Sequence, residues 1–106
     1  MENLRRLHSP FQGHPDCNKC PGVDCSTGSL GQGVSVATGM ALGFKLAGRD
    51  NHVYVLAGAG EIHEGICWEA FLAAAHYKLD NLTVIVDNNH IQLDGTVDEI
   101  MSLGDI

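Results

Sequence analysis

Apolar positions divide the chain into segments with two different spacings. Between residues 30 and 48 they recur at steps of three and four, which predicts a helix whose apolar face is formed by Leu30, Val34, Ala37, Ala41 and Phe44. We expect Thr27 or Ser29 to cap the start of this helix and Gly48 to end it. The glycines within it predict a second backbone packed closely against the helix.

Two short, continuously apolar runs, residues 53–56 and 82–86, predict buried strands. A helix over residues 64–78 is expected between them, with an apolar face of Ile66, Ala70, Ala73, Ala74 and Tyr77. Such strands are usually covered on both faces and pair in parallel through a helical crossover. Because a two-stranded sheet is too small to stand alone comfortably, the sequence predicts one piece of a larger α/β domain.

The ends of the chain carry weaker patterns. Residues 1–8 resemble the end of a helix, and residues 9–29 are rich in proline and glycine and predict a loop. A short helix is expected over residues 97–103.

Charge and length exclude several classes of partner. The chain has 106 residues, enough for one small domain, and a net charge of -7 with only six Lys plus Arg. Without a basic run, nucleic acid is not an expected partner, and a phosphate site would need backbone donors or a metal ion. Neither a membrane-spanning run nor a signal peptide is evident, so we expect a cytoplasmic protein.

Three cysteines, Cys17, Cys20 and Cys25, form a close cluster just after His14. This spacing leaves a zinc or iron-sulfur site open, but structural zinc usually takes two paired half-sites and only one is present. Free thiols packed in a loop are the favoured interpretation.

Polar segments follow both predicted strands. Gly58-Ala59-Gly60-Glu61 follows the first strand, and residues 87–91, Asp-Asn-Asn-His-Ile, follow the second. Ligands of open parallel sheets bind at the carboxyl ends of the strands. Backbone N–H groups at a helix start suit an anion, and amide or carboxylate oxygens suit Mg²⁺ or Ca²⁺. The pattern indicates a site for a metal-bound diphosphate, although a tight strand-to-helix turn alone would look similar.

Several motifs in one order make this interpretation more specific. Gly58-x-Gly60 followed by a helix, a strand and Asn88-Asn89 resembles the thiamine diphosphate motif. The stretches GHPD, STGSLGQG, EGICWEA, HYKLDNL and VDNNHIQLDG resemble transketolase over nearly the whole chain. The resemblance implies a doubly wound parallel-sheet, thiamine diphosphate-binding α/β fold, of which residues 1–106 form part of the N-terminal domain. The LDNL and VDNN residues within these stretches are more similar to N-terminal subunits of split transketolases.

The resemblance also assigns expected metal ligands by position. The family holds Mg²⁺ or Ca²⁺ with an aspartate, an asparagine and a backbone carbonyl, which here correspond to Ala59, Asn89 and the carbonyl of Ile91. Gly60 is expected to lie against the diphosphate, with Glu61 beside it. Since Ala59 stands where the one anionic ligand belongs, we expect weak metal binding or none.

Other roles come from the same resemblance. The backbone of Gly28, Ser29 and Leu30 is expected to face the aminopyrimidine ring. His14 is expected to face the substrate near the reactive carbon of the thiazolium. Glu64 and Glu69 are expected near the dimer interface, where the family couples its two active sites through hydrogen bonds. A loop histidine and ordinary first-turn glutamates are the simpler alternatives.

The implied reaction is transfer of a two-carbon ketol unit between sugar phosphates, a step of the pentose phosphate pathway. The implied partner is a second copy of the chain in a homodimer, or a C-terminal transketolase subunit. Two alternatives remain open: another thiamine enzyme such as 1-deoxyxylulose-5-phosphate synthase, and a non-catalytic remnant or interaction module. A small metal-binding protein built on the three cysteines is the least favoured.

Overall fold

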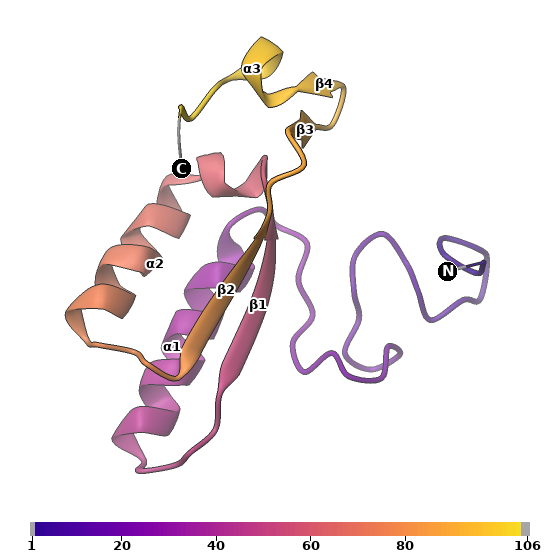
Figure 1. Cartoon of the computed structure of the whole chain (residues 1–106). Helices are drawn as coiled ribbons and strands as arrows, with labels where there is room; N and C mark the ends of the chain where they lie inside the picture. Colours follow the sequence, from indigo (N-terminus) through magenta and orange to yellow (C-terminus); the bar gives the residue numbers. More distant parts are fainter. Residues whose placement is uncertain (1, 105–106) are drawn as a thin grey trace.

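The computed structural model describes residues 2–104 as a βαβ unit preceded by a helix (Figure 1). The main elements are α1 (Gln32–Leu46), β1 (Val53–Gly58), the one-turn 3-10 helix η1 (Glu61–His63), α2 (Gly65–His76) and β2 (Leu82–Asp87). A small hairpin and a short helix follow: β3 (Ile91–Gln92), β4 (Gly95–Thr96) and α3 (Val97–Ile100). The predicted order of helix, strand, helix and strand is confirmed.

The two long strands pair in parallel and in step. Val53 lies opposite Leu82 at one end, and Gly58 lies opposite Asp87 at the other. Their carboxyl ends therefore meet at one edge of the sheet, where the β3–β4 hairpin also sits (Figure 1). The parallel pairing expected from the two apolar runs is confirmed.

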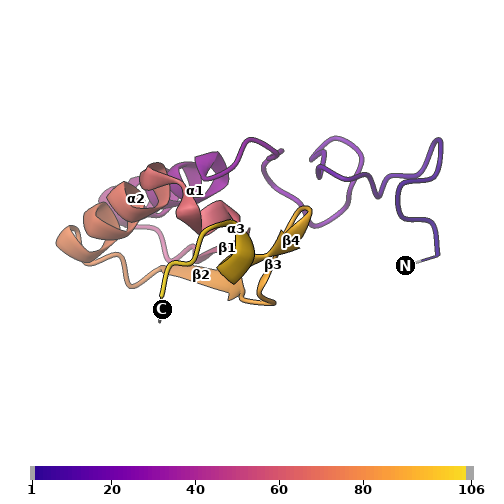
Figure 2. The same cartoon turned by 90° about the horizontal axis from the view of Figure 1, so that it is seen from above.

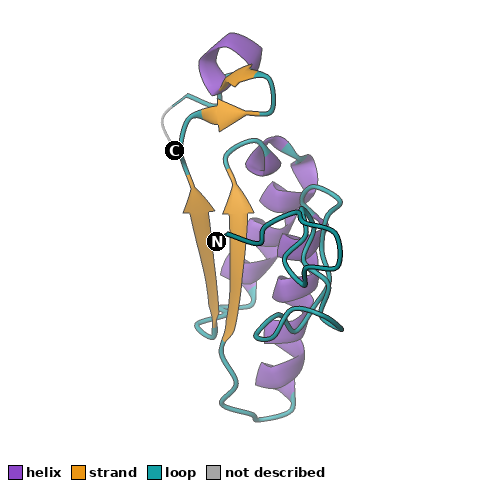
Figure 3. Cartoon of the chain, turned by 90° about the vertical axis from the view of Figure 1, so that its right-hand side faces the viewer, coloured by secondary structure: helices purple, strands orange, loops and turns teal. Residues whose placement is uncertain are grey.

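Both long helices lie on the same side of this sheet (Figures 2 and 3). Two groups of buried side chains fill the space between the layers: one around Val34, Ala57 and Cys67, the other around Ala41 and Val53. On the opposite face Tyr54 is 69% exposed, Leu56 70% and Ile85 51%. The expectation that both faces are covered is therefore wrong for residues 2–104, because a single crossover supplies helices to one face only.

α1 follows the predicted face but not the predicted start. Val34, Ala37 and Ala41 are buried, as expected, whereas Leu30 precedes the helix and is half exposed. The N-cap is Gly31, with a left-handed φ of 78° and no side-chain cap, so the expected capping by Thr27 or Ser29 is wrong.

The end of α1 matches the prediction, but its glycines do not pack as expected. Gly48, with φ 64°, follows the last turn and donates its N–H to the carbonyl of Lys45 at 3.2 Å. A Cβ added at Gly39 or Gly43 would meet no described atom within 4 Å. Nothing in residues 2–104 therefore uses the close approach that these two glycines permit.

The buried face of α2 is turned relative to the predicted one. Ala70 is buried as expected, but Cys67 is fully buried and Tyr77 is 52% exposed. Cys67 was outside the predicted face and takes the inner position that Ile66 was expected to share.

The amino end of β2 is tied to α1, at the opposite end of the molecule from the hairpin. Lys45 Nζ donates to the carbonyl of Lys78 and lies 2.9 Å from Asp80 Oδ1. Asn81 Nδ2 donates to the carbonyl of Ala41 at 2.9 Å. These contacts fix where the second strand starts.

The segment before α1 contains turns and no helix over residues 2–31. The helix end expected at residues 1–8 is wrong where it can be checked, and residue 1 lies outside the described residues. Arg5 and His8 have φ of 61° and 65°, values that a right-handed helix does not contain. The loop predicted for residues 9–29 is confirmed. No helix within residues 2–104 is both long and apolar enough to cross a membrane.

α3 is shorter than predicted because Met101 is extended, with φ -166°. A reciprocal capping box starts it: the Thr96 hydroxyl accepts from the Glu99 N–H, and the Glu99 carboxylate accepts from the Thr96 N–H at 3.1 Å. The spacing Thr-x-x-Glu signals such a box in sequence.

Acid is expected to loosen α3. The bonds from the backbone and then the hydroxyl of Thr96 hold the pKa of Glu99 below its ordinary value of 4.5. Because the folded pKa is depressed, the stabilisation is present above about pH 4.5 and is lost as pH falls through the folded value. An NMR titration of the Glu99 carboxyl should show the low pKa, and Thr96→Val should move it back toward 4.5. A Glu99 that titrates identically in both chains would contradict the capping box.

Candidate functional site

Two polar segments meet at the carboxyl edge of the sheet, as the sequence predicts. The Ala59 N–H donates to the carbonyl of Asp87 at 3.1 Å, which continues the pairing of Gly58 with Asp87. Residues 58–61 and 87–91 therefore lie side by side. The parallel register accounts for this directly.

Ala59 is buried within the turn after β1. It is 4% exposed, and its carbonyl lies 3.1 Å from Nδ1 of His63. The methyl group offers no ligand atom at the position where the resemblance expects a carboxylate.

The carboxylate of Glu61 is held by backbone amides. Oε1 accepts the Gly31 N–H at 2.9 Å, and Oε2 accepts the Gly58 N–H at 3.3 Å. These two donors are the start of α1 and the end of β1, so Glu61 connects the loop before α1 to the turn after β1. The Glu61 carboxylate is therefore held at these two amides, and moving it to replace the missing carboxylate of position 59 would break both bonds.

Removing the Glu61 carboxylate is expected to destabilise the chain. Glu61→Ala would leave the partly buried Gly31 N–H and the exposed Gly58 N–H without their acceptor. The unpaired Gly31 donor should account for most of an expected loss of about 1–3 kcal/mol in the free energy of unfolding. Urea denaturation measures this loss. Glu69→Ala, on the exposed side of α2, is the control and should change stability by less than about 0.5 kcal/mol. Equal stabilities of the two variants would contradict the role of Glu61.

Asn89 uses its side chain within its own turn. Oδ1 accepts the N–H of Ile91 at 2.9 Å, and Nδ2 donates to Asp87 Oδ2 at 3.1 Å. Asp87 is thus bonded by a side-chain amide of the same turn. Ile91 is 61% exposed, and its carbonyl belongs to the β3–β4 hairpin.

Gly60 is covered by a residue that the sequence did not single out. A Cβ added at Gly60 would lie 2.9 Å from Cγ and 3.3 Å from Cδ of Gln92. Gln92 lies within the VDNNHIQLDG stretch, but the sequence assigns it no role, because only the fold of the hairpin brings it back over the turn.

This edge does not fit a divalent metal as it is arranged. Position 59 supplies no carboxylate, the Glu61 carboxylate is held by the Gly31 and Gly58 amides, and Asn89 offers only a neutral oxygen, which also accepts the Ile91 N–H. Within residues 2–104, no group of three His, Cys, Asp or Glu side chains is placed to hold a metal ion. Mg²⁺ in proteins is usually coordinated by one or two carboxylates together with phosphate oxygens.

A hollow of about 590 Å³ lies in the loop before α1, and we call it the loop hollow. His14, Gly28 and Ser29 line it, together with the first turn of α1. The His14 ring packs on Gly28, where an added Cβ would lie 2.9 Å from Nδ1. Three of the expected site residues are thus together, while Leu30 is 51% exposed and outside the lining.

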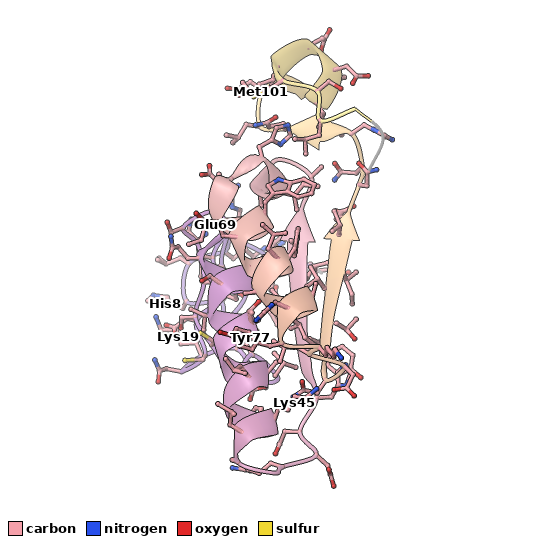
Figure 4. The ribbon with its side chains drawn as sticks, turned by 90° about the vertical axis from the view of Figure 1, so that its left-hand side faces the viewer. His8, Lys19, Lys45, Glu69, Tyr77 and Met101 are labelled. Atoms are coloured by element: carbon pink, nitrogen blue, oxygen red, sulfur yellow. The ribbon has the colours of Figure 1, made fainter. Side chains whose placement is uncertain are left out.

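The two glutamates of α2 lie at its start and on its outer surface. Glu64 is the exposed N-cap residue, without a side-chain cap bond. Glu69 is exposed one turn later (Figure 4). Neither belongs to the loop hollow or to the edge around Gly60 within this chain.

The thiols are of two kinds. Burial, and then the charges of Glu61 and Glu64, raises the pKa of the Cys67 thiol, which donates to the carbonyl of Glu61 at 3.4 Å. In the loop, Cys17 Sγ accepts from the Ser26 hydroxyl at 3.3 Å, and Cys17, Cys20 and Cys25 are free thiols.

Known proteins share this arrangement over nearly the whole chain. Residues 1–105 match the family model described as "Transketolase, thiamine diphosphate binding domain". The chain belongs to the transketolase family. One of the subunits of apulose-4-phosphate transketolase from Actinobacillus succinogenes is 50% identical over 95% of this chain and 37% of that protein. Transketolase of Aquifex aeolicus is 40% identical over 90% of this chain and 15% of that protein.

A solved structure confirms the transketolase fold. Transketolase from Campylobacter jejuni superposes with a TM-score of 0.82 at 39% identity, covering 97% of this chain and 17% of that one. The expectation that this chain is part of a doubly wound α/β, thiamine diphosphate-binding fold is therefore confirmed, although residues 2–104 themselves supply helices to one face of the sheet only (Figure 3). This transketolase-family chain spans only about a third, or less, of the length of these relatives.

Proposed function

We propose that this chain supplies part of a thiamine diphosphate site for transketolase-type transfer of a two-carbon ketol unit between sugar phosphates. The observation that supports this most is the meeting of residues 58–61 with residues 87–91 at the carboxyl edge of the sheet. Open α/β sheets bind ligands at this edge. When bound, thiamine diphosphate supplies the chemistry of the carbon–carbon bond, and the protein positions it.

The proposal gives each group a role. Gly60 would lie against the diphosphate, the backbone of Gly28 to Leu30 would face the aminopyrimidine, and His14 would face the substrate. The grouping of His14 with Gly28 in the loop hollow supports the last two roles. Glu64 and Glu69 are exposed and so accessible to a second subunit, which fits a role at an interface.

The metal part of this site is weakened. Asn89 and the carbonyl of Ile91 would remain as neutral ligands for Mg²⁺ or Ca²⁺, with Ala59 in place of the anionic one. Neutral oxygens supply coordination but no charge, so we infer that the chain binds the Mg²⁺ complex of the cofactor weakly or not at all.

A partner completes the enzyme in this proposal. The Actinobacillus succinogenes relative is named as one subunit of its transketolase, and this chain spans 37% of its length. The sheet face around Tyr54, Leu56 and Ile85 is apolar and open. We infer that further protein, a C-terminal subunit or a second copy in the cytoplasm, is needed before any turnover.

Calorimetric titration of the 106-residue chain with thiamine diphosphate, with and without Mg²⁺, tests the proposal. Saturable binding, even at millimolar concentration, would support it. Absence of binding both by the chain and by a chain whose carboxylate at position 59 is restored would overturn it.

A second candidate is a non-catalytic transketolase-like remnant or interaction module. The buried methyl of Ala59 favours this alternative, because it removes the one charged ligand that the family uses. Binding that appears only after the carboxylate is restored would support it.

A further inference from the structure

The side chain of Gln92 occupies the space directly over Gly60. The position of an added Gly60 Cβ lies 2.9, 3.3 and 3.6 Å from Cγ, Cδ and Cβ of Gln92. Glycine normally leaves its backbone open to close approach by a ligand. Here the Gln92 side chain of the same molecule occupies the space that a ligand would need to reach the Gly60 backbone.

The amide of Gln92 is not held there by hydrogen bonds to its oxygen. Oε1 is buried and has no hydrogen-bond partner among the described residues. A buried acceptor without a donor is unfavourable, because it has lost its hydrogen bonds to water. The side chain would regain a hydrogen bond wherever water or a donor could reach it, so its present position is one that a ligand can displace.

The backbone that carries Gln92 is fixed more firmly than its side chain. Gln92 pairs with Gly95 in the hairpin, and the Val97 N–H donates to the carbonyl of His90 at 2.9 Å. The capping box of α3 holds the other end of the hairpin. Rotation of one side chain, rather than movement of the hairpin, is therefore the smallest change that uncovers Gly60.

We propose that Gln92 sets the affinity of this edge for a diphosphate group, because the ligand must displace the Gln92 side chain from Gly60. The inference rests on the proposed function, since it takes the diphosphate of the cofactor as the group that binds Gly60. It differs from the effect of Ala59, which concerns metal charge. Gln92 acts by occupying space, and its effect requires no metal.

Inorganic diphosphate is the probe, titrated into the 106-residue chain with EDTA and, separately, with Mg²⁺. Gln92→Ala is expected to bind about tenfold more tightly than the unchanged chain, equivalent to about 1.4 kcal/mol. Leu93→Ala is the matched control, since it shortens a neighbouring side chain of the same hairpin that is 92% exposed. It should leave the affinity unchanged.

Two further measurements keep the inference testable if Gln92→Ala folds poorly. Gln92→Asn, shorter by one methylene, should bind more tightly in the same direction. In the unchanged chain, NMR should show the Gln92 side-chain amide and the Gly60 N–H shifting together as diphosphate is added. Shifts at Gly60 without any at Gln92 would overturn the inference.

The same titrations in the Ala59→Asp background separate this inference from the proposed function. If Ala59→Asp binds diphosphate with Mg²⁺ but Gln92→Ala adds nothing in either background, only the role of Gln92 falls. If the doubly changed chain, Ala59→Asp with Gln92→Ala, binds no diphosphate, both the inference and the proposed function fall.

Discussion

Ala59→Asp is expected to make thiamine diphosphate binding strongly dependent on Mg²⁺. The carboxylate would stand beside Asn89 and the carbonyl of Ile91, where the family places its anionic ligand, and would complete the oxygen set that Mg²⁺ prefers. We expect the affinity in Mg²⁺ to rise by at least about tenfold, or 1.4 kcal/mol. Calorimetric titration of both chains, each with and without Mg²⁺, measures the change.

The same substitution is expected to lower stability when metal is withheld. Ala59 is 4% exposed, so the new carboxylate would lose most of its hydration without gaining a cation. The thermal midpoint should fall in EDTA and recover when Mg²⁺ and cofactor are added, because ligands that bind the folded state stabilise it.

Ala59→Asn is the matched control for charge. Its side chain has nearly the same shape, so it should also destabilise the chain in EDTA. It should not produce the large response to Mg²⁺. If the asparagine and aspartate variants respond equally to Mg²⁺, the missing charge at position 59 is not what weakens the metal site.

Gly31→Ala is expected to cause the largest loss of stability of any single methyl addition in the described chain. Gly31 has a φ of 78°, and its new Cβ would lie 2.4 Å from Cγ2 of Ile66 and 3.3 Å from Sγ of Cys67. The left-handed backbone costs about 1–2 kcal/mol, and forced repacking of α2 adds about 1–3 kcal/mol. Urea denaturation should therefore show a loss of about 2–5 kcal/mol, the sum of these two costs.

Two other glycines separate the causes of that loss. Gly48→Ala shares the left-handed backbone, with φ 64°, but meets no described atom within 4 Å, so only the conformational cost should appear. Gly39→Ala lies in the middle of α1 with open space around it and should stabilise the helix by about 0.5–1 kcal/mol. A Gly31→Ala chain no less stable than Gly48→Ala would show that α1 and α2 can move apart.

Periodicity was enough to predict the elements whose signal lies within one segment. The two strands, the buried face of α1 and the end of α1 at Gly48 followed from spacing and local chemistry. The meeting of residues 58–61 with residues 87–91 followed from one further rule, that parallel strands bring their carboxyl ends together. The fold class and the meeting of these two polar segments were therefore predictable.

Contacts between distant segments were not predictable in the same way. Glu61 accepts the N–H of Gly31, the N-cap residue of α1, from 30 positions away. Gln92 covers Gly60 because a two-residue hairpin turns the chain back, and the sequence signal for that hairpin is weak. The exposed face of the sheet could not be foreseen either, since apolar strands look alike whether one face or both are covered by the same chain.

Because Gly58 must pair with Asp87, the arrangement of this edge depends on contacts at the far end of the molecule. Lys45 and Ala41 of α1 fix the start of β2 through Asp80 and Asn81. Deleting one residue from the loop between α2 and β2 would shift β2 by about 3.3 Å along its axis. Each side chain of β2 would then point to the opposite face of the sheet. Asn89 would then leave the neighbourhood of Gly60 although neither residue had changed. The length of a loop remote from this edge is thus as strict a requirement for the proposed binding as the identity of any residue proposed to face the cofactor.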